Sequence, residues 1–495
     1  MARQSTHEDE KAAAALHEDA LADVLRRLPP RSLAAARSVC KAWRAAVDGR
    51  ALLLLHPVRG VFVNYVDHDR PHLFARPSPP SAVPGIDDLL DFIPKEYRRW
   101  WSVLDHCNGL LLCDMEWPSR FIVCNPATRQ WALVPQRAGA KQGDHEGAYL
   151  VFDPAVSPHY EVVLIPVVPE KPPPPDRRKV DEERRALLRE QEKDAEFCLD
   201  WFFSLPDGAV TANNDNVEET HQAHQIQQLP SVEEPDDDPC RLMEWPPVPW
   251  TLQVFSSRTG QWEEKAFVRE DEPAGIVQDM RLDPPSKSLF HGPRQWYAVY
   301  LQGALYVHCR GSFVARISFT DDKYRVIKAP ANIEYAKLYV GRLENRVCFG
   351  ITHECQLRVW TLNESYGKME WVMKCQDDLM HCAKHVGENS REMHGAWIVK
   401  EEDTVPKESS EWDSDNDDIF EVNDKVDAEF YVNQFDILGF HQYKEVVFLV
   451  GHFGVVAYHL DTSKVQYLGN ARPECYYLSH SNGVYESFVY DRRSC

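Results

Sequence analysis

The first regular pattern in the chain lies at residues 16–47, where apolar side chains recur at helical spacing. Four of them fall at positions i, i+3, i+4 and i+7 and therefore share one face: Leu21, Val24, Leu25 and Leu28. Pro29 and Pro30 end this helix, because proline lacks an amide donor and disfavours a helical conformation in the residue before it. Ser32 can cap a second short helix, and the spacing of Val39 and Trp43 indicates a third. The pattern predicts three short helices.

From about residue 58 the pattern changes to short apolar runs separated by turn residues, which is typical of β-strands. Similar eight-residue segments lead from an apolar strand through a polar turn to an aromatic residue: 124–131, 255–262, 317–324 and 460–467. Trp262, Tyr324 and Trp371 are separated by 62 and then 47 residues, a spacing that suits four-stranded propeller blades. We therefore expect a mainly β, propeller-like repeat domain over residues 58–495. The strand candidate 58–66 is expected to pair with 484–490 and so close the ring.

Two stretches interrupt the β pattern. Residues 169–245 contain the proline run 172–175 and a charged, helix-like piece. Residues 383–428 are acidic, and 401–429 alone hold 13 Asp or Glu against two Lys. Segments this charged and poor in apolar residues bury little surface, so both are predicted to be solvated, disordered or partly helical insertions.

Charge and cysteine usage narrow the class of protein. A net charge of -22 argues against a nucleic-acid binder, because phosphate contacts need a concentrated basic surface. No apolar stretch approaches the roughly 20 residues that cross a membrane. The 13 cysteines include no CxxC pair and resemble buried, reduced thiols. We therefore expect a cytoplasmic or nuclear protein with no nucleic-acid or membrane partner.

The sequence lacks the short motifs that mark common classes of enzyme. The sequence contains no GxSxG, HExxH, GxxxxGK[ST] or GxGxxG, which would indicate hydrolase, metalloprotease or nucleotide chemistry. The one cluster that suggests a metal fits no standard zinc spacing: Cys375, His381, Cys382, His385 and His394. We interpret these five as core or loop residues and predict no catalytic residue, no metal and no cofactor.

Two regions resemble known families. The run from Leu16 to Asp19, the leucine-proline-proline at 28–30 and the valine-cysteine-lysine-x-tryptophan-arginine at 39–44 closely resemble an F-box, which we place at residues 12–50. His17 departs from the pattern, since F-boxes usually have proline there. Residues 107–112 and 125–131 resemble the F-box-associated or kelch-like domains that follow F-boxes in large plant families. The expected fold class is thus α+β, a small three-helix F-box before a mainly β, propeller-like domain.

The resemblance implies a function. It implies the substrate-recognition subunit of a Skp–cullin–F-box ubiquitin ligase, which docks on a Skp-type adaptor and, through it, on cullin and RING subunits. The distal domain would capture a protein target that the sequence does not identify. Residues expected to bind the adaptor, carried over from the family pattern, are Leu16, Leu25, Leu28, Pro29, Leu33, Val39, Cys40 and Trp43. Such a subunit holds the target protein near the conjugating enzyme and performs no catalysis itself.

Two other functions stay open. A propeller can host an enzyme such as a kelch-type oxidase, which metal analysis of the purified protein would reveal. The chain could also be a scaffold that binds partners without directing their degradation, in which case loss of adaptor binding leaves partner abundance unchanged. Four tryptophans could line a recognition surface, although packing between strands is the commoner use: Trp100, Trp101, Trp245 and Trp250.

Overall fold

The computed structural model describes most of the region 58–490. Its gaps are residues 67, 78–85, 88, 99, 116–119, 141–144, 171–237, 283–296, 309, 332–336, 354, 366, 390–394, 400–418, 421–434, 475 and 477–482. Before residue 58 it describes only Leu21, Leu25, Ala36, Trp43, Arg44 and Ala46, each in helical backbone. The three predicted helices therefore lie almost wholly outside the described residues.

The chain divides into two compact units. One contains Met1–Val168 and Glu244–Cys495, and the other is Pro169–Met243. The described residues of the second unit form turns, one of which is held by the Cys240 amide donating to the Asp238 carboxylate over 2.9 Å. This unit falls inside the predicted insertion 169–245. The last two residues of that range belong instead to β9 (Glu244–Trp245), which pairs with β12 (Gly275–Ile276).

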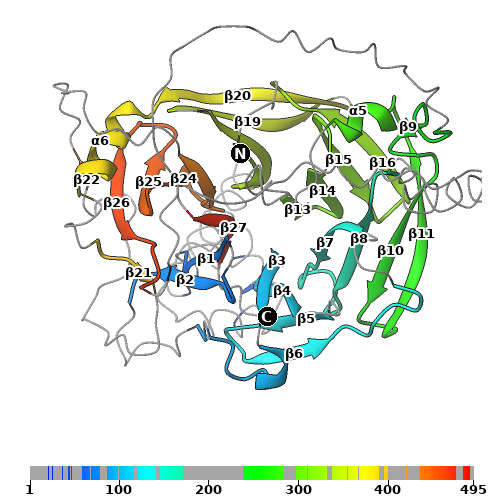
Figure 1. Ribbon diagram of the computed structural model, residues 1–495, viewed down its shortest axis with the longest axis horizontal. Coiled ribbons are helices and arrows are strands. Elements are labelled where there is room, and N and C mark those ends of the chain that lie inside the picture. The colour runs from blue at the N-terminus through cyan, green and yellow to red at the C-terminus, as the bar shows by residue number, and fades with distance from the viewer. Residues whose placement is uncertain are drawn as a thin grey trace, which may run out of the picture. The chain divides into compact units, whose positions relative to one another are not determined.

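The first unit is built from sheets that follow one another along the chain (Figure 1). Each sheet is called a blade, and its strands are given from the innermost outwards. Blade 1 has β27 (Val484–Tyr490), β1 (Gly60–Tyr65), β2 (His72–Ala75) and β21 (Ile398–Val399), and blade 2 has β3 (Trp101–Cys107), β4 (Leu110–Met115), β5 (Arg120–Asn125) and β6 (Gln130–Leu133). Blade 3 has β7 (His145–Val151), β8 (Glu161–Pro166), β10 (Trp250–Ser256) and β11 (Gln261–Arg269). Blade 4 has β13 (Ala298–Leu301), β14 (Ala304–His308), β15 (Phe313–Ser318) and β16 (Lys323–Lys328); blade 5 has β17 (Lys337–Leu343), β18 (Arg346–His353), β19 (Gln356–Ser365) and β20 (Lys368–Asp378); blade 6 has β23 (Asp436–Phe440), β24 (Val446–Gly451), β25 (Gly454–His459) and β26 (Val465–Asn470), with β22 (Ile419–Phe420) added outside. Short helices accompany them: η2 (Lys95–Tyr97), α5 (Val277–Arg281) and α6 (Met380–Asn389).

The innermost strands contact one another in sequence, β27 to β3, β3 to β7, β7 to β13, β13 to β17, β17 to β23, and β23 back to β27. Within the described residues this unit is therefore a closed ring of six blades, and a propeller-like, mainly β domain is confirmed. Blades 3 and 4 form one eight-stranded sheet, because β11 and β16 pair in parallel at their outer edges.

Ring closure occurs between the two ends of the β domain. Strand β1 pairs antiparallel with β27, with Val61 opposite Val489 and Phe62 opposite Phe488. All four side chains are buried. The predicted pairing of 58–66 with 484–490 is confirmed, and it leaves no open inner edge at the junction of the chain ends.

The apolar pattern follows position within a blade. Middle strands such as β24 and β25 are covered on both faces, and all their residues are buried. The outermost strand β20 has mostly exposed or half-buried residues. The repeated eight-residue segments are the hairpins between the third and fourth strands of blades, with Phe255 opposite Trp262 and Ile317 opposite Tyr324. Segment 460–467 differs, because Val456 rather than Leu460 lies opposite Tyr467.

The acidic insertion predicted at 383–428 includes residues near both of its ends that belong to the folded domain. Ala383 and Val386 of α6 are buried in the core, and so is Trp397 beyond it. The strand β22 pairs with β26 through residues 419 and 420. These residues belong to the fold because α6 presents an apolar face to blade 6, a pattern hidden in the sequence by the acidic residues that follow it.

Candidate functional site

The predicted adaptor-binding residues are described at two positions. Leu25 is fully buried in a helix, which makes it a core residue in this structure, and Trp43 is half-buried in a helix. Arg44, next to Trp43, is exposed. The remaining predicted contacts lie outside the described residues: Leu16, Leu28, Pro29, Leu33, Val39 and Cys40.

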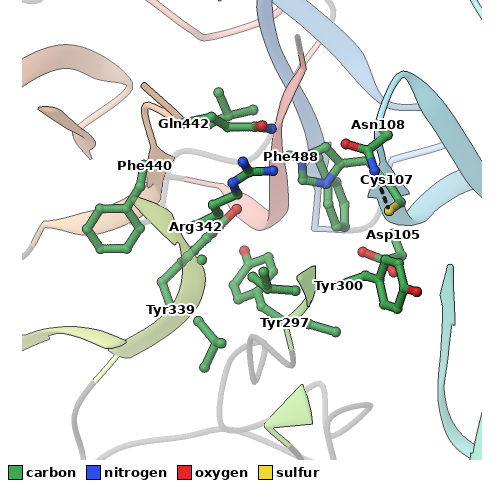
Figure 2. Close-up of a pocket in the computed structure, with 16 residues that line it drawn as sticks. Asp105, Cys107, Asn108, Tyr297, Tyr300, Tyr339, Arg342, Phe440, Gln442 and Phe488 are labelled. Atoms are coloured by element: carbon green, nitrogen blue, oxygen red, sulfur yellow. Dashed lines mark hydrogen bonds between the residues drawn. The ribbon is translucent and has the colours of Figure 1, made fainter. Parts of the chain in front are cut away.

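A pocket is lined by residues of five of the six innermost strands (Figure 2). Its walls come from β3, β13, β17, β23 and β27 and from the turns that follow two of them. The space open to water is about 50 Å³, enough for a few water molecules.

A buried carboxyl group forms part of this wall. Asp105 lies in β3 just after a register shift in its pairing with β4, and its Oδ2 accepts a hydrogen bond from the Leu150 amide of β7 over 2.7 Å. Burial raises the pKa of Asp105 to about 8, since a charged carboxylate loses its hydration in the interior. The carboxyl group therefore carries a proton near neutral pH and links blades 2 and 3 without contributing a negative charge.

The proton on Asp105 predicts a pH dependence of stability. The folded pKa lies above the ordinary value of 3.8, so the folded state holds a proton that the unfolded state releases between about pH 4 and pH 8. Stability should fall as pH rises through this window, by at most ~1.4 kcal/mol per pH unit. Asp105→Asn has no such proton and keeps an acceptor for the Leu150 amide. Relative to wild type, its free energy of unfolding in urea should rise from about pH 5 to about pH 8; parallel curves would contradict the assignment.

Two tyrosines with closely spaced, mutually tilted rings form the pocket wall beside Asp105. The rings of Tyr297 (just before β13) and Tyr339 (β17) have centroids 3.8 Å apart. The Ser487 amide of β27 donates to the Tyr297 hydroxyl over 3.1 Å, and the Tyr339 hydroxyl donates to the Ser487 carbonyl over 3.1 Å. Burial raises the pKa of both phenols. These hydroxyls therefore stay protonated and tie the innermost strands of blades 1, 4 and 5 together.

Polar side chains stand at the rim. Arg342 of β17 is held by its own hairpin turn, its Nε donating to the Glu344 carbonyl over 2.7 Å and its Nη2 to the Asn345 Oδ1 over 3.0 Å. Asn108 occupies the β3–β4 turn with φ of 48° and donates to the Phe152 carbonyl over 2.6 Å. Gln442 follows β23, and Figure 2 shows Arg342 reaching towards it.

This pocket was not predicted from the sequence. Its residues come from strands that are hundreds of positions apart, and no local motif marks them. The only signal was the Cys107-Asn108-Gly109 turn, noted for its resemblance to a domain family. A single sequence without a ring register cannot bring Asp105, Tyr297 and Arg342 together.

The residues considered for a metal site behave as ordinary side chains where they are described. The Cys375 thiol donates to the Asp377 carboxylate over 3.2 Å, and burial raises its pKa to about 12. Burial likewise raises the pKa of Cys382 to about 12. Among the described residues no three His, Cys, Asp or Glu side chains are grouped to hold a metal ion. The His394 position and the His385 side chain lie outside the description.

Three of the four tryptophans considered for recognition are packed inside. Trp101, Trp245 and Trp250 are buried, while Trp100 is 50% exposed. Trp250 contacts the ring of Tyr324 edge-on, within the core shared by blades 3 and 4. Packing is therefore the role of these three side chains.

Comparison with known proteins finds a domain match near the start of the chain. An F-box domain model matches residues 15–55. The chain is 30% identical to the F-box/kelch-repeat protein At1g24800 of Arabidopsis thaliana over 125 residues, covering 24% of this chain and 28% of that one. It is 26% identical to the F-box protein At3g08750 of the same plant over 113 residues, covering 22% and 28%. The solved structure of YCF48 bound to D1 peptide covers 83% of this chain at 7% identity with a TM-score of 0.29.

Residues 15–55 match the F-box domain, and the described ring of blades begins after them, at Gly60. Over part of its length the chain is similar to an F-box protein and an F-box/kelch-repeat protein of Arabidopsis thaliana. The matches span only 28% of the length of these two relatives. In the described residues no helix has the length and apolar character of a membrane span.

Proposed function

We propose that this chain is the substrate-recognition subunit of a Skp–cullin–F-box ubiquitin ligase. Its F-box docks on a Skp-type adaptor, which connects it to cullin and RING subunits, and its β-propeller captures a protein target. The observation that carries the proposal is the F-box match at residues 15–55, directly ahead of the closed ring that begins at Gly60. In this role the chain acts in the cytoplasm or nucleus and contributes no catalytic residue, because holding the target near the conjugating enzyme suffices.

The test compares the full chain with a variant that lacks residues 1–57, which end before the first blade. The full chain should co-purify with adaptor and cullin, whereas the truncated chain should retain its targets and lose both ligase subunits. Proteins bound by the truncated chain should then rise in abundance in cells. Absence of adaptor from the full-chain complex would refute the proposal, and unchanged abundance of the bound proteins would point to the scaffold function instead.

A further inference from the structure

The turn between β7 and β8 presents a serine followed by a proline at the protein surface. Ser157 precedes Pro158, and the sequence has one other Ser-Pro pair, at 78–79, outside the described residues. Val156 is 82% exposed and His159 is exposed as well, while Ser157 itself is half-buried. Proline-directed protein kinases phosphorylate serine in this two-residue sequence, and an exposed turn is where a second protein can reach it.

Two hydrogen-bond donors already point at the Ser157 hydroxyl. The His159 amide donates to its Oγ over 3.1 Å, and the Arg258 Nη2 donates to the same atom over 3.5 Å. Arg258 is exposed and belongs to the turn between β10 and β11. That turn lies beside the β7–β8 turn, because the Ser257 amide donates to the Tyr160 carbonyl over 2.9 Å and the Tyr160 amide to the Ser257 Oγ over 2.8 Å. Donors from two adjacent turns therefore converge on the atom that a phosphate would extend.

The charge of Arg258 is available to a new anion. In the described ranges no carboxylate lies within ion-pair distance of its guanidinium group. Burial raises the pKa of Glu161, and the Arg258 charge opposes that shift, so the two groups interact without forming a pair. Asp153 adds a like charge to the serine's own turn, but its Oδ1 accepts a hydrogen bond from the Ala155 amide over 2.9 Å, which compensates part of that charge.

The equivalent turn of blade 2 has an arginine already paired with an anion. There the third and fourth strands are joined by a turn that carries Arg129, and its Nε donates to the Asp87 Oδ2 over 3.0 Å. Arg258 lies in the corresponding turn of blade 3 and meets a neutral hydroxyl instead. Phosphorylation would give Ser157 three acceptor oxygens and a charge of about -1.5 to -2 near neutral pH. Arginine and phosphate then form charge-assisted hydrogen bonds, which are stronger than those of a hydroxyl.

We propose that Ser157 is a phosphorylation site for a proline-directed protein kinase and that its phosphate pairs with Arg258. The kinase transfers the terminal phosphoryl group of ATP to the Ser157 Oγ: an O–P bond forms on the serine, the O–P bond to the ADP leaving group breaks, and the hydroxyl proton is released. The new pair adds to the hydrogen bonds that hold the two turns of blade 3 together. This inference does not depend on the ligase role, because it uses neither the F-box nor a captured target.

The first test is a kinase reaction on the full chain with ATP and a proline-directed kinase that is active on a Ser-Pro peptide. Mass spectrometry of proteolytic fragments should find a phosphoryl group on Ser157. Ser157→Ala should lose it, and Pro158→Ala should lose it as well although the hydroxyl is kept. An unmodified Ser157 in the wild-type chain, whether or not Ser78 is modified, would overturn the site, as would equal modification of Ser157 in Pro158→Ala.

The second test asks whether the phosphate meets Arg258. A chain carrying Ser78→Ala has one Ser-Pro site, and phosphorus NMR follows the second ionisation of its phosphoserine, which ordinarily has a pKa of about 6. A neighbouring cation favours the dianion, so this pKa should be lower by about half a unit than in the same chain with Arg258→Met. Equal pKa values in the two phosphorylated chains would overturn the pairing.

Arg346→Met is the matched control for Arg258→Met. Arg346 is also an exposed arginine at a hairpin, in blade 5, and its replacement removes an equal charge away from the site. The phosphoserine pKa should be the same in this variant as in its Ser78→Ala parent, and a rise equal to that of Arg258→Met would mean that net charge rather than a local pair sets it. Before phosphorylation all three chains should unfold at the same temperature, because contacts of exposed arginines contribute little to stability.

Discussion

Replacing Leu28 and Trp43 together by alanine should abolish co-purification of the chain with a Skp-type adaptor while the β-propeller stays folded. Apolar burial contributes roughly 25 cal/mol per Å², and large central anchors commonly cost about 2 kcal/mol or more each when truncated. Two such losses weaken binding by about a thousand-fold. Trp43 fits such an anchor, because it is only half-buried within the chain and so still has apolar area to cover. Quantitative pull-down of adaptor and cullin measures the effect.

Arg44→Ala is the matched control for this double variant. Arg44 is the neighbour of Trp43 in the same helix and is exposed, so its truncation should weaken adaptor binding little. Circular dichroism of each full-length variant separates lost contacts from an unfolded F-box. Wild-type levels of adaptor and cullin in the double-variant pull-down would contradict adaptor binding through these residues, on which the proposed ligase role depends.

Ending the chain after Gly483 should destroy cooperative folding of the β-propeller. This truncation removes β27, the innermost strand of blade 1, together with its pairing to β1. It also removes Phe488 and Tyr490, which are buried, and the hydrogen bond from the Tyr490 hydroxyl to the Gly109 carbonyl of 3.1 Å. Loss of one such large side chain alone costs about 3–5 kcal/mol, which is a large fraction of the roughly 5–15 kcal/mol by which a typical domain is stable.

The comparison is a chain that ends at Tyr490 and lacks only residues 491–495. It keeps every residue of β27 and should unfold as wild type does, with a midpoint within about 2 °C. Differential scanning calorimetry distinguishes the two truncations. A sharp transition near the wild-type temperature in the chain that ends at Gly483 would mean that blade 1 does not close the ring.

Local sequence patterns predicted the parts of the fold that depend on residues close together in the chain. The polar turn with a following aromatic marked the outer hairpins of blades 2, 3 and 4, since a cross-strand pair such as Phe255 with Trp262 is only seven positions apart. The continuous apolar run at 446–450 lies in β24, a strand whose residues are all buried. The pairing of the chain ends followed from a general rule, that a closed ring leaves no exposed inner edge.

The sequence by itself determined the F-box pattern and the mainly β repeat domain, because helical spacing and the alternation of strands with turns depend on neighbouring residues. Ring closure could be predicted as well, but only from the general rule that exposed strand edges are avoided. Only the tertiary structure decided three other features. It joined blades 3 and 4 through the parallel β11–β16 contact, returned α6 and Trp397 to the core, and gathered Asp105, Tyr339 and Arg342 around one pocket. Each depends on contacts between residues far apart in the chain, and such contacts are set by how the blades pack rather than by the local order of polar and apolar residues.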